Sequence, residues 1–400
     1  MKKLFTIVSM TLIIPALTSC GGGPKGDMPW IVDRFDDIKV IRYEVPGFDA
    51  LPLEEKELIY YLSEAAKCGR DILFDQNCPV NLPVRRTLET VYENYKGDRT
   101  TAEWKALEKY LKKVWFANGI HHHYSNDKFV PEFSEAYFRE VATSLPAALP
   151  GDLQPMFELV CEAIFNPDLY PTRLNQTAGE DLLWTSSSNY YRNVRQAEAE
   201  KFYADMAAAD AGNPEPVSYG LNSQLVKEEK TGRIYERVWK VGGMYSPAIE
   251  RIVYWLEKAQ AVAAEPQKST IGALIEYYRT GDLKRFDEYN IDWVKDTVSN
   301  VDFVNGFIED YGDPLGRKAS WEAIVNFMDR EACHRTEVIS ENAQWFEDHS
   351  PVDPAYRKEK VKGVSAKVIT VAMLGGDCYP STPIGINLPN ADWIRKEYGS

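Results

Sequence analysis

Acidic side chains lie beside a tyrosine in a segment rich in glycine and proline, from Gly306 to Gly316. A carboxylate of Glu309 or Asp310 could bind an ammonium group, and the Tyr311 hydroxyl could donate to an oxyanion that develops during a reaction. The residues alone favour a plainer interpretation, in which Asp313-Pro314 is a turn and Tyr311 is a half-buried packing residue. The segment is therefore a candidate site that needs further support.

A second candidate runs from Pro383 to Asn390, after a β-branched and apolar run, Val368 to Met373, that predicts a buried strand. Asn387 and Asn390 flank a proline, and their amides offer both donors and acceptors. Such a pair suits an edge that reads a peptide backbone. From the residues alone, turn formation is the favoured explanation of this segment.

The sequence contains no complete catalytic motif. Metallopeptidases of the common type need two histidines one helical turn apart with a glutamate between them, and no His-Glu dipeptide occurs here. A G-x-S-x-G elbow, a phosphate loop and a dinucleotide fingerprint are also missing. His121, His122 and His123 are consecutive, so their side chains diverge, and we predict a structural role rather than metal ligation.

The elements that would position these candidates are mostly helical. Apolar spacing predicts an amphipathic helix within Leu53 to Phe74, and a capping box of Thr100 and Glu103 predicts the start of another. Further helices are expected over Phe133 to Leu145, over Leu153 to Phe165, and after the cap residue Ser246 with Pro247 at the first helical position. A β-hairpin is expected within Val217 to Val241. The fold class predicted is α+β, rich in helix.

The length of the chain bears on its domain organisation, and its net charge bears on the partners that it can bind. A chain of 400 residues exceeds the size of one ordinary hydrophobic core, so two lobes, or one core with a large insertion, are expected. The net charge of −14 argues against a nucleic-acid partner, because phosphate binding needs clustered Lys and Arg.

The N-terminus has the pattern of a bacterial lipoprotein signal. Lys2 and Lys3 precede an apolar run from Leu4 to Leu17, and Cys20 follows small residues. We expect removal of residues 1–19, lipid attachment at Cys20, and an exported protein anchored to a membrane at the periplasmic or cell-surface side. An uncleaved anchor or an ordinary signal peptide is the alternative. The remaining five cysteines are odd in number and form no CxxC pair, so no disulfide framework is implied.

Three ordered stretches of the chain resemble the dipeptidyl peptidase III family, zinc metallopeptidase family M49. They are Tyr245 to Ala259, Gly306-Phe-Ile-Glu-Asp-Tyr-Gly-Asp-Pro-Leu-Gly316 and Gly385-Ile-Asn-Leu-Pro-Asn390. The likeness is clear from about residue 240 to 400, and it suggests the N-terminal portion of a bacterial, lipoprotein-type member. The run Asn118 to Tyr124 also resembles bacterial members, in which it is not the zinc site.

The resemblance implies a two-lobed peptidase with a β-barrel in its lower lobe and a helical upper lobe. It places 51–328 in the lower lobe, 329–366 in a segment of the upper lobe, and 367–400 in a return to the lower lobe with a substrate-binding strand. Glycines and weak periodicity separately predict a tether and extended start over residues 20–50, with order beginning near Leu51. Within that frame, the family's roles fall on a small set of positions. Glu309, Asn387 and Asn390 would hold the free N-terminus of an oligopeptide substrate, Tyr311 would stabilise the tetrahedral intermediate, and Gly385 and Ile386 would pair with the peptide backbone.

The resemblance also implies a zinc ion held by two histidines of an H-E-x-x-(x)-G-H helix and a downstream glutamate. These ligands are expected beyond Ser400, so we expect this chain alone to be inactive. A non-enzymatic lipoprotein that binds peptides or glycans is the alternative, because ten Trp and 23 Tyr could stack on sugar rings. A pseudoenzyme that keeps only the peptide cleft is a further possibility.

Overall fold

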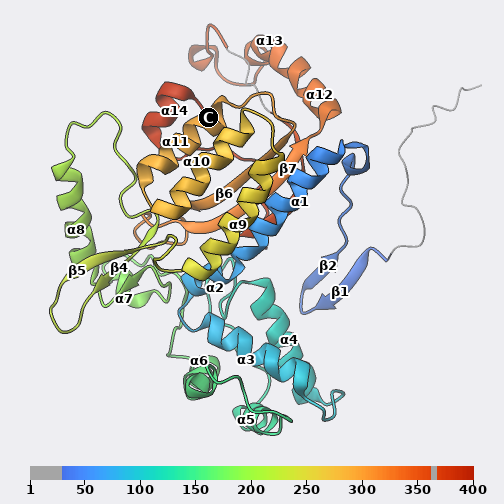
Figure 1. The fold of residues 1–400 in the computed structure, drawn as a ribbon, viewed down its shortest axis with the longest axis vertical. Coiled ribbons are helices and arrows are strands. Elements are labelled where there is room, and N and C mark those ends of the chain that lie inside the picture. Colours follow the sequence, from blue (N-terminus) through green and yellow to red (C-terminus); the bar gives the residue numbers. More distant parts are fainter. Residues whose placement is uncertain (1–28, 362–366) are drawn as a thin grey trace, which may run out of the picture. The chain divides into compact units, whose positions relative to one another are not determined.

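The computed structural model describes residues 29–361 and 367–400. The lipoprotein signal and Cys20 therefore lie outside the described residues, as does part of the segment 329–366 expected in an upper lobe. The chain separates into two compact units, residues 1–44 and residues 45–400. Helices and sheets are mixed throughout the larger unit, which confirms the mixed helix and strand class (Figure 1).

The described part of the smaller unit is a β-hairpin that the sequence analysis did not predict. Strands β1 (Ile31–Phe35) and β2 (Ile38–Ile41) pair antiparallel across a two-residue turn. Asp36 adopts a left-handed conformation, φ 51°, which a short polar residue tolerates at a tight turn. Regular structure thus begins at Ile31, whereas we expected it to begin near Leu51.

Five helices near the start of the larger unit enclose one apolar core that includes Val84, Trp104 and Phe138. The helices are α2 (Arg70–Asn77), α3 (Asn81–Asn94), α4 (Ala102–Phe116), α5 (Glu135–Thr143) and α6 (Phe157–Phe165), with short 3-10 turns η1 (Phe48–Ala50) before them and η2 (Gln154–Met156) among them. The helices predicted around α5 and α6 are confirmed. The cap of α4 was predicted one residue early, since Thr101 rather than Thr100 accepts the hydrogen bond from the Trp104 backbone N–H.

A three-stranded antiparallel sheet organises the rest of the larger unit. Its order is β6 (Val301–Glu309), β7 (Ser320–Met328) and β8 (Ile369–Gly376). Helix α1 (Leu53–Cys68) contacts all three strands and packs along α9 (Ser246–Val262), while α10 (Gln267–Thr280) packs between α9 and α11 (Leu283–Lys295) (Figure 1). Strand β8 is half-buried rather than buried as predicted.

The predicted hairpin is confirmed as β4 (Ser223–Lys227) and β5 (Ile234–Val238), with β3 (Tyr191–Arg192) pairing parallel to β4. Helices α7 (Leu182–Thr185) and α8 (Gln196–Ala209) lie next to this small sheet. The remaining elements are α12 (Arg330–Glu341), α13 (Ala343–Asp348), η3 (Pro354–Tyr356) and α14 (Asp392–Tyr398). The described strands form three separate sheets, and none of these sheets closes into a barrel.

Two predicted helix boundaries differ from the structure. Helix α9 begins at Ser246 itself, and Tyr245 occupies the cap position with φ 64°. The helix predicted from Leu53 to Phe74 divides at Gly69 into α1 and α2, because Gly69 lies directly against the Trp321 ring. In residues 29–361 and 367–400, no helix combines the length and apolar character needed to cross a bilayer.

The contact between Gly69 and Trp321 makes a testable prediction. A Cβ atom at Gly69 would meet the Trp321 ring at 2.3 Å, so Gly69→Ala should lower the free energy of unfolding by about 1–3 kcal/mol. Gly151→Ala is the matched control, because nothing lies within 4 Å of its added Cβ. Urea unfolding followed by tryptophan fluorescence measures both, and equal stability of the two variants would contradict the packing argument.

Candidate functional site

A cavity of about 380 Å³ lies where β6, β7 and β8 end, and it gathers most of the predicted site residues. Glu309, Tyr311, Gly385, Ile386 and Asn387 all line its wall. The residues that the sequence analysis did not single out there include Asn77, Arg173, Ser320, Glu322, Ile324, Asp377 and Cys378. Two segments far apart in sequence, each chosen from its own pattern, thus meet at one cavity.

The register of the sheet explains why carboxyl groups converge there. Glu309 is the last residue of β6, and Asp377 directly follows the end of β8. Glu322, in β7, is paired with Gly306 on one side and Gly376 on the other. Directly opposed residues in antiparallel strands share a face, so neither neighbour of Glu322 places a side chain beside its carboxyl group.

Glu309 is held by Asn390, the last of the predicted binding residues. The Asn390 side-chain amide donates to Glu309 Oε2 at 3.1 Å and to the Ile308 carbonyl at 3.3 Å. Burial raises the pKa of Glu309, whereas the Asn390 amide opposes that shift. Asn390 therefore orients a carboxylate at the edge of the cavity, although it does not line the cavity itself.

Glu322 is the deepest carboxyl group of the site, with 6% of its surface exposed. Burial, together with the Asp377 and Glu309 carboxylates, raises the pKa of Glu322 to about 8. Its Oε2 accepts a hydrogen bond from the Cys378 thiol at 3.4 Å. Sequence reasoning missed Glu322, although it is the only charged residue of the strand Ser-Trp-Glu-Ala-Ile-Val-Asn-Phe-Met and could have been noticed for that reason.

Tyr311 projects from the loop after β6 and is 75% exposed. This exposure excludes the alternative that it is a half-buried packing residue. The negative charge of Glu309 is the main cause that raises the pKa of Tyr311 above its usual value. The phenol is consequently protonated at neutral pH and can donate a hydrogen bond.

The loop that carries Tyr311 is anchored by Asp313, whose carboxylate is buried. It accepts hydrogen bonds from the backbone N–H groups of Leu315, Arg317 and Lys318 and from the Tyr191 hydroxyl, at 2.8 to 3.2 Å. Asp313-Pro314 is thus a turn, as the plainer interpretation held, and it is also the fixed point of the candidate loop.

One cationic residue, Arg173, also lines the cavity, although it is far from the strands in sequence. Its guanidinium donates to the Asn126 side chain at 2.9 Å and to the His123 carbonyl at 3.3 Å. Burial raises the pKa of Asp377, and the charge of Arg173 opposes this shift. His121, two residues before His123, is buried, and its Nε2 lies 2.9 Å from the Tyr170 carbonyl oxygen. This contact agrees with the structural role that we predicted for His121.

The segment from Ser381 to Asn390 is irregular in the structure, so Gly385 and Ile386 are not part of a strand. Gly385 is exposed, and nothing lies within 4 Å of a Cβ atom built there. Asn387 is also exposed, whereas Ile386 packs against the core. The backbone of this segment is open to the cavity, and its pairing with a peptide stays a prediction.

Two other features of the larger unit are weaker candidates. A cavity of about 990 Å³ between α1, α9 and β8 contains none of the predicted residues, and three of its acids already have cationic partners. Asp71 and Glu89 pair with Arg85, and Glu64 pairs with Lys67. This cavity lacks convergent groups that await a ligand.

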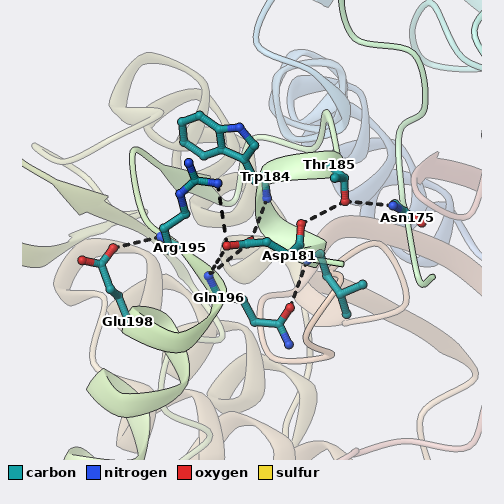
Figure 2. Close-up of polar contacts among 8 residues, drawn as sticks. Asn175, Asp181, Trp184, Thr185, Arg195, Gln196 and Glu198 are labelled. Carbon is teal, nitrogen blue, oxygen red and sulfur yellow. Dashed lines mark hydrogen bonds and ion pairs between the residues drawn. The ribbon is translucent and has the colours of Figure 1, made fainter. Parts of the chain in front are cut away.

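The second weaker candidate is a polar cluster at the junction of α7 and α8 (Figure 2). Asp181 accepts hydrogen bonds from the backbone N–H groups of Trp184 and Gln196, and the Gln196 side chain accepts from the Leu182 N–H. Arg195 stacks on the Trp184 ring, 3.6 Å from its centroid. These contacts fasten the two helices to each other, which indicates a structural role.

The described residues hold no metal centre. In the ranges 29–361 and 367–400, no group of three or more His, Cys, Asp or Glu side chains is placed to bind a metal ion. The five cysteines in these ranges are free thiols. The described residues therefore do not fit a zinc ion.

Comparison with known proteins gives consistent matches. The profile of peptidase family M49 matches residues 186–400. The dipeptidyl peptidase 3 of Rattus norvegicus is 24% identical over 389 residues, covering 88% of this chain and 52% of the relative. That of Dictyostelium discoideum is 31% identical over 163 residues, covering 40% of this chain and 23% of the relative.

Two solved structures share the fold. DPP III from Caldithrix abyssi matches with a TM-score of 0.60 and 16% identity, over 88% of this chain and 54% of that chain. Dipeptidyl-peptidase III from Corallococcus sp. strain EGB matches with a TM-score of 0.56 and 17% identity, over 90% and 54%. The chain spans about half the length of these proteins and of the rat relative.

The anchoring of the loop by Asp313 predicts a stability change. Asp313→Ala leaves several buried donors without an acceptor, so we expect the free energy of unfolding to fall by about 2–4 kcal/mol. Tyr191→Phe removes one of these donors and should cost about 1 kcal/mol. Chemical denaturation compares the two variants, and an Asp313→Ala protein as stable as Tyr191→Phe would show that the carboxylate does not hold the loop.

Proposed function

Because this chain belongs to peptidase family M49, the dipeptidyl peptidase III family, we propose that it forms the peptide-binding part of a zinc-dependent exopeptidase that releases dipeptides from the N-terminus of oligopeptides. The observation that carries the proposal is the single cavity lined by Glu309, Tyr311, Gly385 and Asn387. Glu309 supplies a negative charge and Tyr311 a hydroxyl group. Gly385 offers exposed backbone, and Asn387 offers a side-chain amide.

In the proposed complex, the free N-terminus of the peptide enters the acidic end of the cavity. Glu309, oriented by Asn390, accepts hydrogen bonds from the ammonium group. Glu322 lies deeper on the same face of the sheet and adds a second carboxyl group to this end. Asn387 and the backbone at Gly385 and Ile386 are exposed to receive the peptide main chain. The first residue of the peptide is thereby fixed by its charge and its backbone.

The Tyr311 hydroxyl is proposed to donate to the carbonyl oxygen as it becomes an oxyanion. Its exposure at the cavity wall allows it to reach a substrate, and a tyrosine hydroxyl keeps its proton at neutral pH. A donor of this kind stabilises the transition state more than the ground state, so it should act on kcat rather than on KM.

The zinc ion in this proposal is inferred from membership of the family alone. When bound in such an enzyme, zinc polarises the carbonyl and activates water. The described residues supply no ligand set for it, and the ligands are proposed to lie beyond Ser400.

The proposal also includes the finer architecture implied by the family resemblance. The two lobes, the boundaries near residues 328 and 366 and a closed β-barrel in the lower lobe stay predictions, as do export and lipid attachment at Cys20. The mass of the N-terminal peptide of protein extracted from membranes would check the lipid.

Binding of a free N-terminus can be tested on the chain itself. Glu309→Gln should weaken the binding of tetraalanine roughly tenfold to a hundredfold, because the negative charge that pairs with the ammonium group is lost. Asp310→Asn is the matched control, since the neighbouring acid does not line the cavity. Calorimetric titration measures both, and N-acetyl-tetraalanine should not bind. Equal effects of the two substitutions would overturn the assignment of Glu309.

Activity provides the decisive test. Protein expressed from the complete reading frame should release dipeptides from dipeptidyl-naphthylamides, and a chelator should stop the release. Tyr311→Phe should lower kcat about a hundredfold with little change in KM. Peptide binding without any chelator-sensitive release would instead support the non-enzymatic binding protein, and an unchanged kcat in Tyr311→Phe would remove the proposed role of the hydroxyl.

A further inference from the structure

Glu322 differs from Asp313 and Asp75 in the donors that surround its carboxyl group. Asp313 accepts from three backbone N–H groups and a tyrosine hydroxyl, and Asp75 accepts from Asn189 and Tyr245 at 2.9 and 2.6 Å. The donor to the Glu322 carboxyl is the Cys378 thiol, at 3.4 Å. A thiol is a weak donor, so it compensates little of the cost of burying a carboxylate.

The charges around Glu322 come from several elements. Glu309 at the end of β6, Tyr311 in the following loop, and Asp377 and Cys378 after β8 line the same cavity. Arg173 and His123 line it as well. The charge of Arg173 acts on Asp377 and favours ionisation of that carboxyl. The charges of Asp377 and Glu309 oppose ionisation of Glu322, and a buried carboxyl group beside a half-buried one cannot ionise at low cost while its neighbour is charged.

We propose that this cavity exchanges a proton for an ammonium group: Glu322 is protonated while the cavity is empty and releases its proton when the N-terminus of a peptide enters. This inference rests on the proposed function of the cavity. In the exchange the O–H bond of the Glu322 carboxyl breaks, its proton passes to solvent, and the carboxylate pairs with the peptide ammonium. One positive charge leaves as another arrives, so the net charge of the cavity is unchanged.

The electrostatics of the empty cavity support the exchange. Burial and the neighbouring carboxylates raise the pKa of Glu322 to about 8, so the group is mostly protonated at pH 7. An ammonium group beside it favours the carboxylate and lowers that pKa again. Between pH 6 and 7 peptide affinity should rise by up to about tenfold, because the proton to be displaced is more weakly held. Above about pH 8 affinity should fall, because the peptide amino group loses its own proton.

Calorimetric titration of the 400-residue chain with tetraalanine tests the exchange. The titration is repeated at pH 7 in buffers of different ionisation enthalpy, which counts the protons released. We expect about one proton per peptide, because the proton of Glu322 leaves as the ammonium binds. Glu322→Gln cannot ionise, so it should abolish the release and flatten the rise in affinity between pH 6 and 7. Glu322→Asp keeps a carboxyl group and should restore both.

The outcomes separate this inference from the function on which it rests. If tetraalanine binds and its N-acetyl form does not, the ammonium subsite stands. Binding without proton release, or release that persists in Glu322→Gln, then overturns the exchange alone. If tetraalanine and its N-acetyl form bind equally, or neither binds, the proposed subsite and the exchange both fail.

Discussion

The pairing of β7 with its two neighbours is the constraint on which the candidate site depends. Trp321 and Glu322 are consecutive, so their side chains project from opposite faces of the sheet. The Trp321 ring lies against Gly69 at the junction of α1 and α2, and a Cβ at Gly376 would meet the Trp321 carbonyl at 2.1 Å. A slip of one residue would exchange the two faces. The tryptophan thus fixes the strand in the register that turns the glutamate toward the cavity.

The same register sets the electrostatics of the site. Three carboxyl groups, from Glu309, Glu322 and Asp377, arrive at one cavity from strand ends and a strand interior. A fold that only needed stability would compensate such groups, as the donors around Asp313 do. The weak compensation of Glu322 is typical of positions at which a ligand completes the hydrogen bonding.

Much of the local structure could be predicted from the sequence, because it depends on neighbours in the chain. The hairpin of β4 and β5 and the helices around α5 and α6 follow from short-range periodicity and caps. The segments holding Glu309, Tyr311 and Asn387 were found from residue type and family resemblance. Their meeting at one cavity could not be derived from spacing, since it depends on the sheet.

Most of the predictions that were wrong or missing concern features that depend on residues distant in the sequence. The break at Gly69 results from contact with Trp321, which is distant in sequence, so the helical periodicity of the segment gave no sign of it. Glu322, Asp377 and Arg173 belong to the cavity only through strand pairing and long-range packing. The cap of α4 was misplaced because two threonines are adjacent, and only the geometry shows that Thr101 accepts the hydrogen bond.

The hydrogen bonds of Asp313 should lower the entropic cost of binding a peptide at the cavity. Its carboxylate binds donors along the returning half of the loop and across to β3, so the loop backbone is ordered before any peptide arrives. Ordering a loop upon binding would cost roughly 1–2 kcal/mol of conformational entropy for each residue fixed. An exposed tyrosine on a preorganised loop loses only its own side-chain rotamers. Recognition at this cavity should therefore resemble the docking of a peptide onto a rigid surface rather than the folding of a loop around it.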